Sequence, residues 1–191
     1  MESNLYLEKV KEKGHKLSKL FIKSAVDIAK KEVSAELAYE LALIVDNGRT
    51  KDVDKVRKEL CDVVVKSNNP KFAYLYARDI PKADIPALQT IVENSENPEY
   101  ATEFASDISG IDITKLQSIV VSSKNAFYAY RFAKYVDNAD VKSLENVVAK
   151  SEDVNIIENF MNDIDGVNNR RLNRIKNNIL KNKIQPEENE F

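Results

Sequence analysis

Residues 69–152 consist of three consecutive copies of one 28-residue unit, with no residue inserted between copies. The copies are NPKFAYLYARDIPKADIPALQTIVENSE, NPEYATEFASDISGIDITKLQSIVVSSK and NAFYAYRFAKYVDNADVKSLENVVAKSE, so position 1 of each is Asn69, Asn97 or Asn125. A fixed period of this length is typical of stacked helical hairpins, in which each unit buries its apolar face against its neighbours. The repeat therefore predicts an all-α fold, a right-handed α-solenoid.

One unit, residues 97–124, shows the pattern clearly. Asn97 followed by Pro98 is a typical helix start, because asparagine caps free backbone N–H groups and proline needs no donor in the first turn. Gly110 predicts the end of this helix, and Asp112 is placed to cap a second one. The expected buried stripes are Tyr100, Ala101, Phe104, Ala105 and Ile108, then Ile113, Leu116, Ile119 and Val120.

Weaker copies extend the array on both sides. Residues 34–68 and 153–180 keep the apolar spacing loosely, and the lysine-rich residues 1–33 carry a second-helix pattern. We therefore predict about five helix–turn–helix repeats with a helical N-terminal cap, forming a single α-helical repeat domain over residues 1–183. The expected divisions are a cap at 1–33, repeats at 34–68, 69–96, 97–124, 125–152 and 153–180, and a disordered acidic tail at 184–191.

The opposite stripe of each first helix is the candidate binding face. Positions 3, 6, 7 and 10 carry aromatic side chains and arginine, the types that dominate interface energetics. The alternative is that Tyr39, Tyr74 and Tyr130 pack in the groove between neighbouring repeats. The second helices are expected to expose a solvated surface of Gln89, Glu93, Gln117, Glu145 and Lys150. The candidate partner-binding residues are Tyr39, Tyr74, Leu75, Arg78, Phe127, Tyr130, Arg131 and Lys134.

The sequence shows no combination of residues that is typical of a catalytic or cofactor-binding site. His15 is the one histidine and lies in a lysine-rich helix, where a solvated side chain is expected. Cys61 aligns with Gln89 and Gln117, positions expected to be partly exposed, and no base is near it in sequence. One histidine and one cysteine are too few for the usual metal sites, and four scattered glycines form no phosphate loop. We expect no catalytic residue, no metal and no cofactor.

Charge and apolar content limit the remaining classes. The net charge is −2, but lysines are in excess in the first 31 residues, and a basic cluster contains Arg170, Arg171, Arg174, Lys176, Lys181 and Lys183. A single-stranded nucleic-acid-binding repeat protein is therefore the alternative function, although Glu36, Glu40, Glu99 and Glu103 on the same face would repel phosphates. No window suits a bilayer or a signal peptide, so we expect no membrane contact and a cytoplasmic location.

The unit Tyr-Ala-x-x-Phe-Ala, three to six residues, then Asp-Ile/Val-x-x-Leu resembles tandem repeats of uncharacterised proteins of low-GC bacteria and their phages. It covers residues 69–152 well and its neighbours loosely. The resemblance implies an interaction scaffold, for example a phage or mobile-element inhibitor that binds a host protein such as an antiviral nuclease, in the host cytoplasm. The identity of the protein partner and the oligomeric state stay open.

Overall fold

The computed structural model describes residues 2–45 and 52–184. Within these ranges the chain forms twelve α-helices and one 3-10 turn, without a β-strand, which confirms the all-α prediction. No helix in these ranges is both long and apolar enough to cross a membrane. The predicted tail at 184–191 is wrong at Ile184, which ends the last helix, and its residues 185–191 lie outside the described residues.

The chain divides into two compact units, residues 1–96 and 97–191. The boundary falls between two of the expected repeats. The prediction of a single repeat domain stays a prediction.

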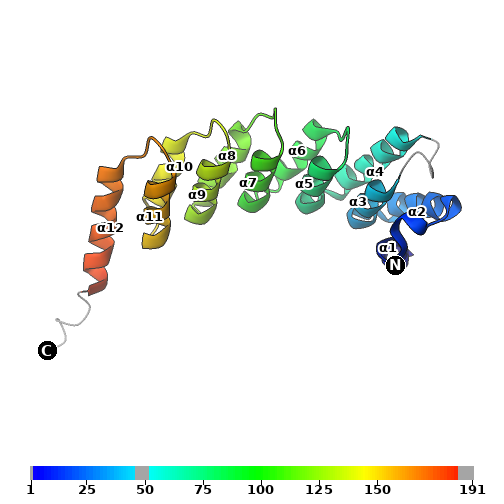
Figure 1. Ribbon diagram of the computed structural model, residues 1–191, viewed down its shortest axis with the longest axis horizontal. Helices are drawn as coiled ribbons and strands as arrows, with labels where there is room; N and C mark the ends of the chain where they lie inside the picture. Colours follow the sequence, from blue (N-terminus) through cyan, green and yellow to red (C-terminus); the bar gives the residue numbers. More distant parts are fainter. Residues whose placement is uncertain (1, 46–51, 185–191) are drawn as a thin grey trace. The chain divides into compact units, whose positions relative to one another are not determined.

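Unit 1 contains the N-terminal helices and two helix pairs (Figure 1). Helices α1 and α2 pack against α3, and α2 also contacts α4. The pairs are α3 with α4 and α5 with α6, and α3 also packs beside α5. The bounds are α1 Glu2–Lys13, η1 Gly14–Lys16, α2 Lys19–Glu32, α3 Ala35–Ile44, α4 Val53–Ser67, α5 Pro70–Asp79 and α6 Ile85–Asn94.

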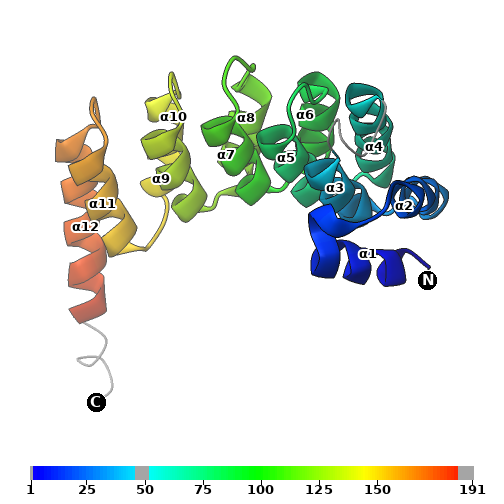
Figure 2. The same ribbon diagram turned by 45° about the vertical axis from the view of Figure 1, so that its right-hand side comes forward.

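Unit 2 consists of three further pairs, α7 with α8, α9 with α10, and α11 with α12. Figures 1 and 2 show α7, α9 and α11 side by side in one row, with their pair partners beside them. The bounds are α7 Pro98–Asp107, α8 Thr114–Ser123, α9 Ala126–Tyr135, α10 Val141–Val148, α11 Val154–Asp163 and α12 Asn169–Ile184.

The predicted caps explain where the helices begin. The side chain of Asn97 accepts hydrogen bonds from the backbone N–H groups of Glu99 and Tyr100 at 2.9 and 3.4 Å, and Asn69 and Asn125 do the same in their repeats. Asp84 and Asp140 cap the second helices as expected. Asp112 accepts a hydrogen bond from the N–H of Thr114 at 2.9 Å but is not the N-cap residue as predicted, because α8 begins at Thr114 and Ile113 holds the N-cap position without a side-chain cap.

The buried stripes largely follow the prediction. Phe104, Leu116, Phe132 and Leu144 are fully buried. The first helices are nevertheless rotated from the expected orientation, because position 4 (such as Tyr100) is only half-buried whereas Thr102 at position 6 is buried. Each first helix packs against its pair partner and also against the neighbouring first helix, so the side of the helix that carries position 6 is covered.

Candidate protein-binding surface

In unit 1 the predicted residue Tyr39 connects two neighbouring repeats. Its hydroxyl donates a hydrogen bond to Asp79 Oδ2 at 2.6 Å, and its ring lies 6.1 Å from that of Phe72. Burial and this bond to a carboxylate raise the pKa of Tyr39 to about 12. The guanidinium of Arg78 donates two hydrogen bonds to the same carboxylate, which keeps the pKa of Asp79 below its usual value. Tyr39 therefore holds α3 to α5.

The other predicted residues of unit 1 lie on α5. Tyr74 is only 6% exposed, so most of its surface is unavailable to a partner. The Arg78 guanidinium lies 5.1 Å from the Tyr74 ring centroid and donates a hydrogen bond to its hydroxyl at 3.0 Å. Leu75 is half-buried. Arg78 is exposed but already contacts Tyr74 and Asp79.

Unit 2 repeats the same arrangement at Tyr130. Its hydroxyl donates a hydrogen bond to Asp163 Oδ2 on the next first helix. Lys134 Nζ lies 2.7 Å from the same carboxylate oxygen and 2.9 Å from the Tyr130 hydroxyl. The hydrogen bond from Lys134 lowers the pKa of Asp163, and the carboxylate in turn raises the pKa of Lys134. The tyrosines at position 6 thus follow the packing alternative at Tyr39 and Tyr130.

Among the first helices of unit 2, α9 carries the most exposed aromatic side chains. Phe127 is 48% exposed and Tyr135 is 55% exposed. Arg131 lies between them in sequence, so the three residues at i, i+4 and i+8 occupy one face of the helix. The Arg131 guanidinium is 5.9 Å from the Phe127 ring centroid. Lys134 Nζ is 5.7 Å from the Tyr135 ring centroid. We call Phe127, Arg131 and Tyr135 the α9 face.

Tyr135 was not among the predicted residues. It occupies position 11, where Asp79, Asp107 and Asp163 stand in the other repeats. The replacement of aspartate by tyrosine at this one repeat position is the sequence signal that could have identified Tyr135. Of the predicted residues, Phe127, Tyr130, Arg131 and Lys134 lie together on α9, whereas Tyr39, Tyr74, Leu75 and Arg78 form a separate cluster in unit 1.

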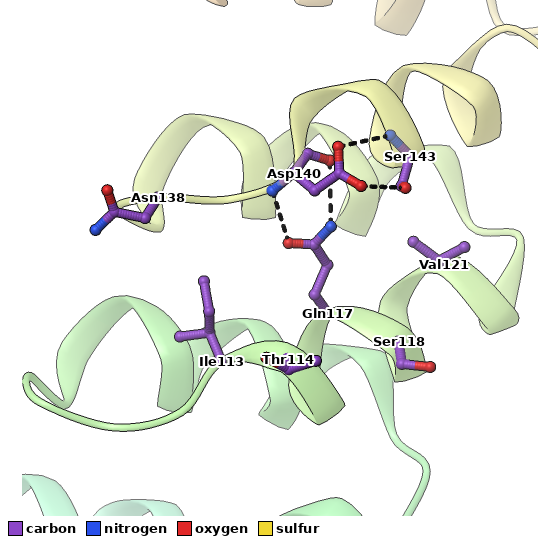
Figure 3. A pocket seen from close by; sticks show the side chains of 8 residues that line it. All are labelled: Ile113, Thr114, Gln117, Ser118, Val121, Asn138, Asp140 and Ser143. Carbon is purple, nitrogen blue, oxygen red and sulfur yellow. Dashed lines mark hydrogen bonds between the residues drawn. The ribbon is translucent and has the colours of Figure 1, made fainter.

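The expectation of a solvated second-helix surface is wrong at Gln117 and Glu145, which are only 9% and 6% exposed. Gln117 Nε2 donates to the carbonyl of Asp140 at 3.1 Å, and its Oε1 accepts from the N–H of Asp140 at 2.9 Å (Figure 3). Glu145 accepts from the N–H of Asn168 at 2.9 Å and from Arg171 at 2.8 Å. This position faces the start of the next second helix, where backbone groups need partners.

The expectation of partial exposure at Cys61 is also wrong. Its side chain occupies the same repeat position as Gln117 and is 4% exposed. Burial raises the pKa of the Cys61 thiol, so the protonated form is favoured and the nucleophilic thiolate is disfavoured. His15 is exposed in the turn between α1 and α2. Across residues 2–45 and 52–184, no group of three or more His, Cys, Asp or Glu side chains is placed to hold a metal ion.

A hollow of about 380 Å³ lies between α8 and α10, lined partly by Ile113, Thr114 and Val121 (Figure 3). Its polar groups are used within the protein: Asp140 accepts hydrogen bonds from the backbone and hydroxyl of Ser143, which lower the pKa of the Asp140 carboxyl. The Gln117 amide is occupied by the Asp140 backbone. These groups therefore stabilise the contact between α8 and α10.

No family model matches this chain, and neither the curated proteins nor the solved structures contain a significant match to it. Function must therefore be inferred from the chemistry of the described surfaces.

Proposed function

We propose that this chain is a non-enzymatic protein-binding scaffold that acts in the cytoplasm. In this proposal it is a right-handed α-solenoid of about five helix–turn–helix repeats with a helical N-terminal cap. The partner contacts the first helices, and the α9 face is the central contact. By the resemblance of its repeats, the chain acts as a phage or mobile-element inhibitor of a host protein such as an antiviral nuclease.

The observation that carries this proposal is the exposure of Phe127 and Tyr135 on either side of Arg131. Two half-exposed aromatic rings and an arginine within three helical turns have the composition of an interface hot spot. The hydroxyls of Tyr39 and Tyr130 already bind carboxylates of the next repeat, so they position the helices. Within residues 2–45 and 52–184 the two outer rings of the α9 face make no such bond to a carboxylate of the next repeat. Burying these rings against a partner would remove apolar surface from water.

The charges around α9 favour a protein over a single-stranded nucleic acid at this face. Glu103 lies 4.0 Å from Arg131, and Asp163 lies 2.7 Å from Lys134. Both cations are therefore already opposed by carboxylates, which reduces the positive potential that a phosphate backbone would require. Glu99 on α7 is also exposed. A partner surface with apolar groups and hydrogen-bond acceptors for Arg131 fits this face better.

The proposal is tested with the triple variant Phe127→Ala, Arg131→Ala and Tyr135→Ala. Tagged wild-type and variant proteins are used to capture partners from a lysate of the host cells, and the captured protein is then purified and titrated calorimetrically. We expect the triple variant to bind at least ~2 kcal/mol more weakly, about 30-fold in Kd, because hot-spot residues contribute on this scale.

The control variant is Leu20→Ala, which removes a 75% exposed apolar side chain from α2. It should bind the partner as wild type does, and circular dichroism should show that both variants keep the helical fold. Equal affinity of the triple variant and wild type would reject the α9 face as the contact surface.

A further inference from the structure

Helix α12 differs from the other second helices of unit 2 in length and in charge. It spans 16 residues, Asn169–Ile184, whereas α8 and α10 span 10 and 8. Its sequence, NRRLNRIKNNILKNKI, contains six cationic residues and five asparagines and lacks an acidic residue. The chain as a whole carries a net charge of −2, so the residues outside this helix are acidic on balance, although lysines are in excess in the first 31 residues.

Five of the six cationic residues fall into two groups according to their direction, and the sixth, Lys183, is exposed in the last turn. Leu172 is fully buried, and it marks the side of α12 that packs on unit 2. On the neighbouring sides Arg171 donates to Glu145 at 2.8 Å and Lys176 to Glu158 at 3.0 Å, so these two cations hold α12 in place.

The outward side of α12 carries Arg170, Arg174, Asn177 and Lys181, at i, i+4, i+7 and i+11. These positions form one stripe opposite Leu172, and all four side chains are exposed. Arg170, Arg174 and Lys181 form no ion pair with residues in the described ranges 2–45 and 52–184. The residues from Leu180 to Lys183 are all exposed, so the last turn of α12 stands clear of its neighbours.

From this arrangement we infer that the outward stripe of α12 binds double-stranded DNA. The stripe is about 16 Å long at 1.5 Å per residue. The helix has a diameter of about 10–12 Å, which the ~12 Å major groove admits. Arg170 and Lys181 at the two ends contact phosphates on the groove edges, while Arg174 and Asn177 between them face the bases, where arginine and asparagine are suitable hydrogen-bonding groups.

The composition of the stripe favours nucleic acid over an acidic protein. Protein interfaces have an apolar, often aromatic core, and the stripe contains no apolar residue. Protein–DNA interfaces are more polar and more positively charged, as this one is. The α9 face has the opposite character, with two exposed aromatic rings and cations opposed by carboxylates. The two surfaces of unit 2 thus suit two different classes of partner, and the DNA site does not depend on the proposed protein contact.

The test uses the full chain and a fluorescent 20-base-pair duplex of mixed sequence, with anisotropy titrations at several salt concentrations. The variant Arg170→Gln, Arg174→Gln and Lys181→Gln removes three outward cations. The matched control, Lys13→Gln, Lys19→Gln and Lys23→Gln, removes the same charge from exposed lysines near the N-terminus. Thermal unfolding of both variants checks that the fold is retained.

We expect the wild type to bind the duplex more strongly at low salt. The α12 variant should bind at least tenfold more weakly, with the slope of log K against log salt smaller in magnitude by about 1.8, since two of the removed cations contact phosphates and each such contact contributes roughly 0.9. The control should stay within about twofold of the wild type. Absence of duplex binding by the wild type at low salt would overturn the inference, as would equal losses in the two variants. Tighter binding to a single strand, or equal competition by polyglutamate, would also overturn it.

Discussion

At the scale of single residues, position 14 of the repeat keeps the same backbone conformation in successive repeats although its side chain differs among them. Position 14 lies in the turn after each first helix and has a positive φ in four successive repeats: 60° at Lys82, 75° at Gly110, 59° at Asn138 and 75° at Gly166. Glycine adopts this conformation freely, asparagine tolerates it, and a lysine is strained there. The turn geometry is therefore set by the packing of the two helices, and the residue at position 14 adapts to it.

Replacing Lys82 by glycine should stabilise the protein by about 0.5–1 kcal/mol, because relief of the left-handed strain exceeds the added entropy of the unfolded chain. Gly110→Ala should destabilise it by about 1 kcal/mol, purely through strain, since a Cβ at Gly110 would meet no atom within 4 Å. Urea denaturation measures both changes in the free energy of unfolding.

The control is Lys82→Ala, which removes the exposed ion pair with Asp54 but keeps the strained conformation. Its free energy of unfolding should stay within about 0.5 kcal/mol of wild type, because exposed ion pairs contribute little. A stabilisation of Lys82→Ala equal to that of Lys82→Gly would contradict the role of backbone strain.

At the scale of helices, neighbouring repeats are joined by polar side chains as well as by the apolar core. The first helices are connected by Tyr39 to Asp79 in unit 1 and by Tyr130 to Asp163 in unit 2. The second helices are connected where a side chain, Gln117 or Glu145, binds the backbone at the start of the next one. These bonds set the register between adjacent pairs, which a purely apolar contact would leave less defined.

The Gln117 contact gives a direct test at this scale. Gln117→Ala should lower the free energy of unfolding by about 1–3 kcal/mol, because in a part-buried position the N–H of Asp140 loses its acceptor and the C=O of Asp140 loses one of its two donors. Ser118→Ala, at an exposed neighbouring site on the same helix, should change stability by less than about 0.5 kcal/mol. If urea denaturation shows similar losses of unfolding free energy for the two variants, the Gln117 hydrogen bonds do not contribute to stability as expected.

At the scale of the whole molecule, the two compact units have cores of the same design. Leu88 of unit 1 and Leu116 of unit 2 occupy the same repeat position, and both are fully buried. In arrays of repeats the stability is approximately a sum of terms from each repeat and its nearest neighbours. A defect in one unit should therefore weaken that unit first.

Leu88→Ala and Leu116→Ala should each cost about 2–5 kcal/mol through the cavity left in the core. Amide hydrogen exchange should show the greatest loss of protection in residues 52–96 for Leu88→Ala and in residues 97–152 for Leu116→Ala, because opening is local. If each variant instead loses amide protection uniformly over both units, the two units unfold as a single cooperative structure. A cost below about 1 kcal/mol would contradict the assigned core.

The sequence by itself was sufficient for the helical class, for the caps at Asn97 and Asp140, and for most of the buried positions, because these depend on local capping and on apolar periodicity. It was not sufficient for the candidate surface. The stripe pattern placed Tyr39 and Tyr130 on a binding face and omitted Tyr135, since helical periodicity does not show which side of a helix the next repeat covers.

Tertiary structure decided the remaining roles. Gln117 and Glu145 look like solvated polar residues in the sequence, yet both are buried, because the start of the following second helix lies against them and its backbone N–H groups donate to them. Likewise, only the packing of α12 on unit 2 separates the cations bound to Glu145 and Glu158 from those that point outward. A charge pattern along a chain contains no information on which charges meet in space, and the fold alone supplies those pairings.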